Sequence, residues 1–257
     1  MSKILLLFLV LCIASFPINY TGASAEDFPD LVIITEQFRP YNFVDNGKLK
    51  GIAVDLLEKM LEKVGSDQTR KDFQVMDWPR GYGLTLRNPM YVLFSTSRTY
   101  IRENLFKWAG PIDTVVTEMF AKKSAKIKIK TFDDLKKYRV GTIINDAGEQ
   151  LLIENGFPSD LIYRVVKRDQ IRKLLYSGRI DLTPDDKKGF MDYARLSGYN
   201  PDDFESVYVL NKRDLYYAFN KDTPDWIVEE LQHALDSLKK EGTYRKILEK
   251  YGVSRTN

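Results

Sequence analysis

The sequence predicts an α/β protein built as two lobes that share a cleft. Two observations lead to this prediction. Short apolar runs typical of buried strands alternate with segments whose apolar residues recur at helical spacing, and the alternation occurs in two successive units of similar build. Polar or charged residues then follow the carboxyl ends of several strands, which is the edge where open α/β sheets bind their ligands.

Residues 1–25 are expected to be a signal peptide. Lys3 precedes an apolar run over residues 4–16, which is shorter than the ~20 residues needed to span a bilayer. Residues 23–25 (ASA) fit a cleavage site, so we expect a mature protein that is exported to the periplasm. The single cysteine, Cys12, lies inside the removed segment, which leaves neither a disulfide nor a thiol nucleophile.

The composition excludes several classes of function. Lys and Arg total 39 against 36 for Asp and Glu, and this near-neutral balance argues against nucleic-acid binding. The only histidine, His233, falls in a long helical pattern near the C-terminus, so no imidazole is available for a catalytic triad or a zinc site. No Gly-rich phosphate loop is present. We therefore expect no metal, no cofactor and no nucleic-acid partner.

The first unit opens with LVIIT at residues 31–35, a run typical of a buried strand, and continues into an aromatic loop over residues 36–43. Residues 45–47 (DNG) are a turn signal, and apolar residues at helical spacing predict a helix over 54–64. The next strands are predicted at residues 73–76 and 91–94.

The carboxyl ends of these strands bring polar and aromatic side chains to one edge of the sheet. The candidate ligand-binding residues there are Glu36, Phe38, Trp78, Arg80, Ser95, Thr96, Ser97 and Arg102. Hydroxyls beside a guanidinium form a receptor for a small anion, most naturally a carboxylate that arginine grips with two hydrogen bonds. The alternative is a Ser/Thr-rich turn that caps a following helix, with Arg102 a solvated surface charge.

The second unit repeats this build. Asp146 and Asp186 follow two of its strands and so add carboxylates to the candidate site. Strands are predicted at 114–121, 138–144, 162–166 and 180–183, and helices at 131–135, 149–155 and 170–176. The chain then runs through strands at 207–210 and 215–220 to helices at 225–240 and 244–251.

Motifs spread over residues 31–251 carry a family resemblance. They are PYNF at 40–43, NGKLKG at 46–51, VDLL at 54–57, TYIR at 99–102, FKWAGP at 106–111, LKKYRVG at 135–141, GRID at 178–181 and the terminal segment 238–251. In order and spacing they resemble the family 3 extracellular solute-binding proteins, the periplasmic receptors for polar amino acids and similar small solutes.

The resemblance implies a type II periplasmic binding protein fold with a two-segment hinge. Lobe I would comprise residues 26–115 and 208–257, and lobe II residues 116–207. The protein would be a monomeric receptor rather than an enzyme, and it would deliver a small polar solute, such as an amino acid or related carboxylate, to the membrane permease of an ABC transporter.

The resemblance also implies roles for individual residues. Arg102 occupies the position that takes the ligand carboxylate, with Ser95 and Ser97 beside it. Phe38 and Trp78 fall where two aromatic rings sandwich the ligand, and lobe II would supply Asp186 for the α-ammonium. A zwitterion independently requires a cation and an anion that face each other.

The chain departs from the family pattern after its second-lobe strand. Asn145-Asp146-Ala147 stands where amino-acid receptors usually carry Gly-Thr-Thr, and the extra carboxylate favours a more cationic ligand. Arg80 beside Trp78 acts against this by adding positive charge. Asp185 or Asp186 could face the cleft, since both follow Pro184.

Two alternative functions remain compatible with the sequence. The same fold hosts secreted dehydratases of prephenate-like acids, in which Asp146 or Glu36 would act as the general acid. The protein could also be the ligand-sensing partner of a membrane receptor.

Overall fold

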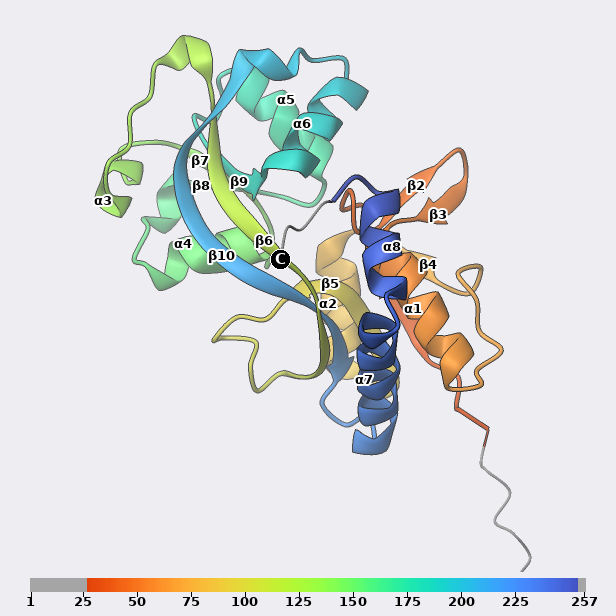
Figure 1. The fold of residues 1–257 in the computed structure, drawn as a ribbon. Helices are drawn as coiled ribbons and strands as arrows, with labels where there is room; N and C mark the ends of the chain where they lie inside the picture. The colour runs from red at the N-terminus through yellow and green to blue at the C-terminus, as the bar shows by residue number, and fades with distance from the viewer. Residues whose placement is uncertain (1–26, 254–257) are drawn as a thin grey trace, which may run out of the picture.

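The computed structural model describes residues 27–253, so the predicted signal peptide lies outside the described residues. The helices and strands form two groups, here called the first and second lobes. Two long strands, β6 (Phe106–Lys122) and β10 (Phe204–Asn220), run from one lobe to the other (Figure 1). They belong to a six-stranded sheet with the order β4-β1-β5-β10-β6-β9.

The first lobe is formed by the N-terminal elements and the C-terminal helices. It contains β1 (Val32–Thr35), β2 (Phe43–Asp45), β3 (Lys48–Lys50), β4 (Gln74–Val75), β5 (Tyr91–Ser97), α1 (Ile52–Lys63), α2 (Trp78–Arg87), α7 (Asp225–Lys240) and α8 (Thr243–Lys250). Strand β1 pairs in parallel with β4 and β5, and its two faces are both covered. Ile33 packs into the core beneath α1 and α7, while Ile34 packs on the side of α2. Burial on both faces explains the continuous apolar run in this segment.

The second lobe contains β7 (Val140–Ile143), β8 (Ile162–Val165), β9 (Thr183–Asp186), α3 (Phe132–Leu135), α4 (Ala147–Glu154), α5 (Arg168–Tyr176) and α6 (Lys187–Leu196). Strands β7 and β8 form a parallel pair, and β9 pairs antiparallel with β6. The ring of Phe120 on β6 stacks on Phe190 of α6 with a centroid separation of 4.3 Å, which anchors α6 to the crossing strand.

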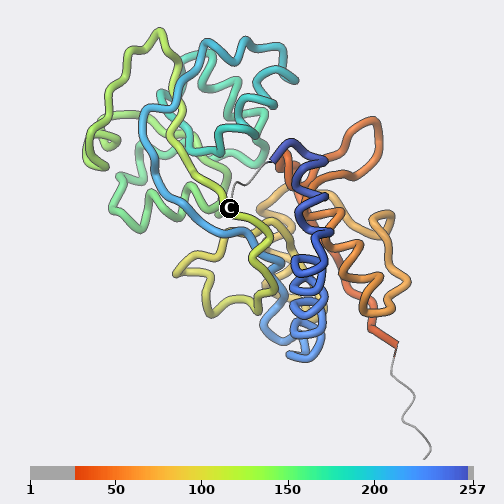
Figure 2. Tube along the Cα trace, viewed as in Figure 1, coloured from red at the N-terminus to blue at the C-terminus, as the bar shows by residue number. Residues whose placement is uncertain are grey.

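The crossing strands are paired along their whole length and lie side by side in the chain trace (Figure 2). The ladder extends from Phe204 opposite Lys122 to Asn220 opposite Phe106, with three register shifts on β10. The sequence predicted two separate strands, at 207–210 and 215–220. The structure corrects this to one strand, because the polar residues 211–214 continue the ladder against β6. Both predicted lobe boundaries fall inside these strands.

Two α-helices were not predicted from the sequence: α2 carries residues of the candidate site, and α6 directly follows Asp186. Helix α2 begins at Trp78, so Trp78 and Arg80 form its first turn rather than a loop. The glycines in this segment lower its helical propensity, so the sequence does not predict a helix here. Gly81 is required by packing, since a Cβ atom there would lie 2.9 Å from the Ile34 side chain.

Helix α6 is the second of these helices, and the strand before it also differs from the prediction. The expected strand at 180–183 is shifted to β9, so Asp185 and Asp186 end a strand instead of following one. The turn signal at 45–47 is confirmed: Asn46 and Gly47 connect β2 to β3 with φ angles of 49° and 72°. Within residues 27–253, no helix has the length and apolar character to cross a membrane.

Candidate functional site

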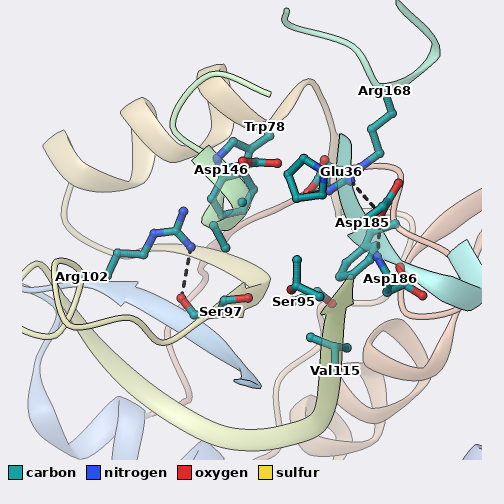
Figure 3. Close-up of a pocket in the computed structure, with 15 residues that line it drawn as sticks. Glu36, Trp78, Ser95, Ser97, Arg102, Val115, Asp146, Arg168, Asp185 and Asp186 are labelled. Carbon is teal, nitrogen blue, oxygen red and sulfur yellow. Dashed lines mark hydrogen bonds and ion pairs between the residues drawn. The ribbon is translucent and has the colours of Figure 1, made fainter. Parts of the chain in front are cut away.

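A cavity of about 60 Å³ lies where the two lobes meet (Figure 3). The first lobe contributes residues at the ends of β1 and β5 and from the start of α2, and the second lobe contributes the starts of α4 and α5 and the end of β9. The lining side chains are Glu36, Phe38, Trp78, Ser95, Ser97, Arg102, Val115, Thr117, Asp146, Ala147, Gly148, Arg168, Pro184, Asp185 and Asp186.

Ser95 reaches the cavity through an irregularity in β5. Tyr216 of β10 pairs with Thr96 and Tyr217 pairs with Phe94, so Ser95 is an extra residue in the ladder. Its φ angle of 59° lies in the left-handed region, which residues other than glycine seldom adopt. Its hydroxyl oxygen is buried without a hydrogen-bond partner. A bulge that re-aims a side chain is common beside ligand sites.

Arg102 is fully buried between the lobes. Its guanidinium donates to the Ser97 carbonyl at 3.1 Å and to the Asn145 carbonyl at 2.8 Å, and it lies 5.0 Å from the ring centroid of Trp78. Its Nε atom has no partner. Burial lowers the pKa of Arg102, and Tyr82 opposes this shift. The solvated-charge alternative for Arg102 is therefore excluded.

Asp146 and Asp186 cap two helices of the second lobe. The Asp146 carboxylate accepts from the Glu149 amide at 2.8 Å at the start of α4, and Asp186 Oδ1 accepts from the Gly189 amide at 2.8 Å at the start of α6. Burial raises the pKa of Asp146 to about 6. Burial and the neighbouring Asp185 raise the pKa of Asp186 to about 7. Asp186 Oδ2 is buried without a partner.

Arg168 lines the cavity and was missed by the sequence analysis. It stands at the start of α5 and forms ion pairs with Glu36 and Asp185, each at 3.3 Å. Burial acts to lower the pKa of Arg168, but the carboxylates outweigh it and the pKa is raised. Burial is the main cause of the raised pKa of Glu36. The only signal in the sequence was the position of Arg168 just after a predicted strand, within the charged run Lys167-Arg168-Asp169.

Most of the predicted site residues line this one cavity, namely Glu36, Phe38, Trp78, Ser95, Ser97, Arg102, Asp146 and Asp186. Two do not. The Thr96 hydroxyl donates to the Leu93 carbonyl at 3.0 Å, since successive strand residues point to opposite sides. Arg80 is exposed and lines only an outer groove of about 660 Å³, because its position in the first turn of α2 leaves its side chain outside the inner cavity.

Trp78 is held at the junction of the lobes. It stacks on Tyr82 at 5.5 Å, and its indole N–H donates to the Asn145 carbonyl at 2.9 Å. That carbonyl also accepts from Arg102. The Asn145 backbone, with a φ angle of 60°, therefore ties the second lobe to two side chains of the first.

Comparison with known proteins defines the class of protein. A model of the bacterial extracellular solute-binding proteins, family 3, matches residues 31–254, and the chain belongs to this family. A probable amino-acid ABC transporter-binding protein of Haemophilus influenzae is 25% identical over 243 residues, covering 88% of this chain and 86% of that protein. The L-cystine-binding protein TcyA of Bacillus subtilis is 23% identical over 212 residues, covering 82% of this chain and 75% of that protein.

The fold is that of the type II periplasmic binding proteins, as the sequence predicted. The structure of an ancestral arginine-binding protein bound to arginine superimposes with a TM-score of 0.74 and 24% identity, covering 87% of this chain and 99% of that one. Within residues 27–253, no group of three His, Cys, Asp or Glu side chains is arranged to hold a metal ion.

Proposed function

We propose that the protein is exported to the periplasm, where as a monomer it captures a small amino acid for the permease of an ABC importer. The observation that carries this proposal is the pairing of opposite charges across the cavity. Arg102 lies on one side and Asp186 on the other (Figure 3). A zwitterion supplies the complementary groups, a carboxylate for the guanidinium and an ammonium for the carboxylate.

Unsatisfied polar atoms in the cavity wall support this assignment. Ser95 Oγ, Arg102 Nε and Asp186 Oδ2 are buried without partners, which is costly unless a ligand completes their hydrogen bonds. Burial disfavours the ionised forms of Asp146 and Asp186 and raises their pKa values, and a bound ammonium would offset this effect. Phe38 and Trp78 add apolar surface to the same cavity.

The direct test is to identify the small molecule that the protein retains. Protein purified from the periplasm without denaturation is unfolded, and the released solute is identified by mass spectrometry. The same protein, after dialysis, is titrated calorimetrically with each standard amino acid. We expect at least one amino acid to bind with micromolar or tighter affinity. A retained solute that has no amino group, together with no heat from any amino acid, would refute the proposal.

The curated relatives described above are binding proteins. Incubation with prephenate should accordingly give no product. Turnover that depended on Asp146 or Glu36 would instead favour the dehydratase alternative.

A further inference from the structure

The acidic side of the cavity is occupied by a positive charge that belongs to the chain. The Arg168 guanidinium lies 3.3 Å from Glu36 Oε1 and 3.3 Å from Asp185 Oδ1, and 5.1 Å from the centroid of the Phe38 ring (Figure 3). The three charged side chains are only 11–16% exposed. Water therefore screens this cluster weakly, and its charges interact more strongly than a surface pair would.

The partners of Arg168 form a subsite for an organic cation. Two carboxylates beside an aromatic face attract a guanidinium or an ammonium by charge and through the π system of the ring. Glu36 and Phe38 come from the first lobe and Asp185 comes from the second. Arg168 already occupies this subsite, so a positively charged ligand side chain cannot bind there.

Arg168 also limits the length of the cavity. Glu36, Trp78 and Arg168 line both the inner cavity of about 60 Å³ and the outer groove of about 660 Å³. These side chains therefore form the partition between the two spaces. The inner cavity is much the smaller of the two spaces, so a ligand that is confined to it by Arg168 must have a small side chain.

We propose that Arg168 determines the ligand specificity of the site. It fills the cation subsite and restricts binding to amino acids whose side chains are small and carry no positive charge. This inference rests on the proposed function, because it assumes that the ligand is an amino acid held between Arg102 and Asp186.

Removing Arg168 should reverse this selectivity. In Arg168→Ala, Glu36 loses its guanidinium partner, whereas Asp185 keeps Arg172, whose Nη2 lies 3.7 Å from it. The space vacated by the side chain joins the inner cavity to the outer groove. The side chain of a bound arginine can then extend into that space and place its own guanidinium beside Glu36.

The test is calorimetric titration with alanine, serine, glutamine, lysine and arginine. Wild-type protein should prefer one of the neutral amino acids over arginine by at least tenfold. In Arg168→Ala, the ratio of arginine affinity to neutral amino-acid affinity should rise by at least tenfold. The double variant Arg168→Ala/Glu36→Gln should lose that gain. Arg195→Ala is the control, since Arg195 is 62% exposed and pairs with Asp192 on the surface of α6.

The possible outcomes separate this inference from the proposed function. A wild-type preference for arginine or lysine, or an unchanged ratio in Arg168→Ala, would overturn the role of Arg168 and leave the amino-acid receptor intact. A failure of wild-type protein to bind any amino acid would refute both. If Arg168→Ala unfolds, Arg168→Gln, which keeps much of the side chain, is titrated instead, and thermal melts with and without arginine give the same ratio.

Discussion

Replacing Arg102 with alanine should reduce ligand affinity about 30-fold to a few thousandfold. The side chain is fully buried, so the ligand carboxylate that we propose it binds would be left desolvated and unpaired in the variant. Losing one partner of such a pair costs roughly 2–5 kcal/mol, and each 1.4 kcal/mol is about tenfold in affinity. A smaller part of the loss comes from the Asn145 carbonyl, which would keep only its bond from Trp78.

The assay is calorimetric titration of the native ligand, with circular dichroism to show that each variant is folded. Arg98→Ala is the matched control. Its side chain is 38% exposed and pairs with Glu103 on the surface. This substitution should therefore weaken the free energy of ligand binding by only ~0–1 kcal/mol. Arg102→Lys keeps the charge but loses the two-pronged geometry, and it should fall between alanine and wild type. Binding by Arg102→Ala within threefold of wild type would refute the assignment of Arg102 to the ligand carboxylate.

Three further outcomes are expected. Because the pKa of Asp186 is about 7, acidification protonates the Asp186 carboxylate, the proposed partner of the ligand ammonium. Ligand affinity should therefore fall about tenfold per pH unit below 7. Asp186→Asn should bind weakly at every pH, and an unchanged slope in this variant would point to another group. Ligand should change tryptophan emission in wild type but not in Trp78→Phe, since Trp108 and Trp226 lie outside the cavity. Ser95→Gly should raise the free energy of unfolding by about 1 kcal/mol, because it relieves the left-handed φ, yet it should weaken binding. Chemical denaturation and titration of the same sample check both effects, and a destabilised variant would show that the backbone there is unstrained.

The strands and the residues at their ends were predictable because their signals are local. Strand β1 is buried on both faces, and strands of this kind have continuous apolar sequences. The rule that ligands bind at the carboxyl ends of strands then brought Arg102 and Asp146 into one candidate site without knowledge of the packing. The structure places both at the cavity.

Features that depend on long-range contacts could not be predicted in the same way. Arg168 lies in a run of charges that is typical of a solvated helix start, and only the approach of the first lobe brings it to Glu36. Arg80 was wrongly assigned to the ligand site because helix α2 was not predicted. Gly81 and Gly83 lower the helical propensity of this segment, and in the helix the side chain of Arg80 lies outside the inner cavity. The polar stretch 211–214 looks like a loop until β6 is seen to pair with it.

The continuous ladder between β6 and β10 restricts how the two halves of the molecule can move. Because hydrogen bonds join the crossing strands along their length, neither can slide past the other without breaking them. The remaining freedom is bending and twisting of the ribbon as a unit, and it concentrates at the register shifts between residues 206 and 217 of β10. Relative motion is thereby reduced to few degrees of freedom.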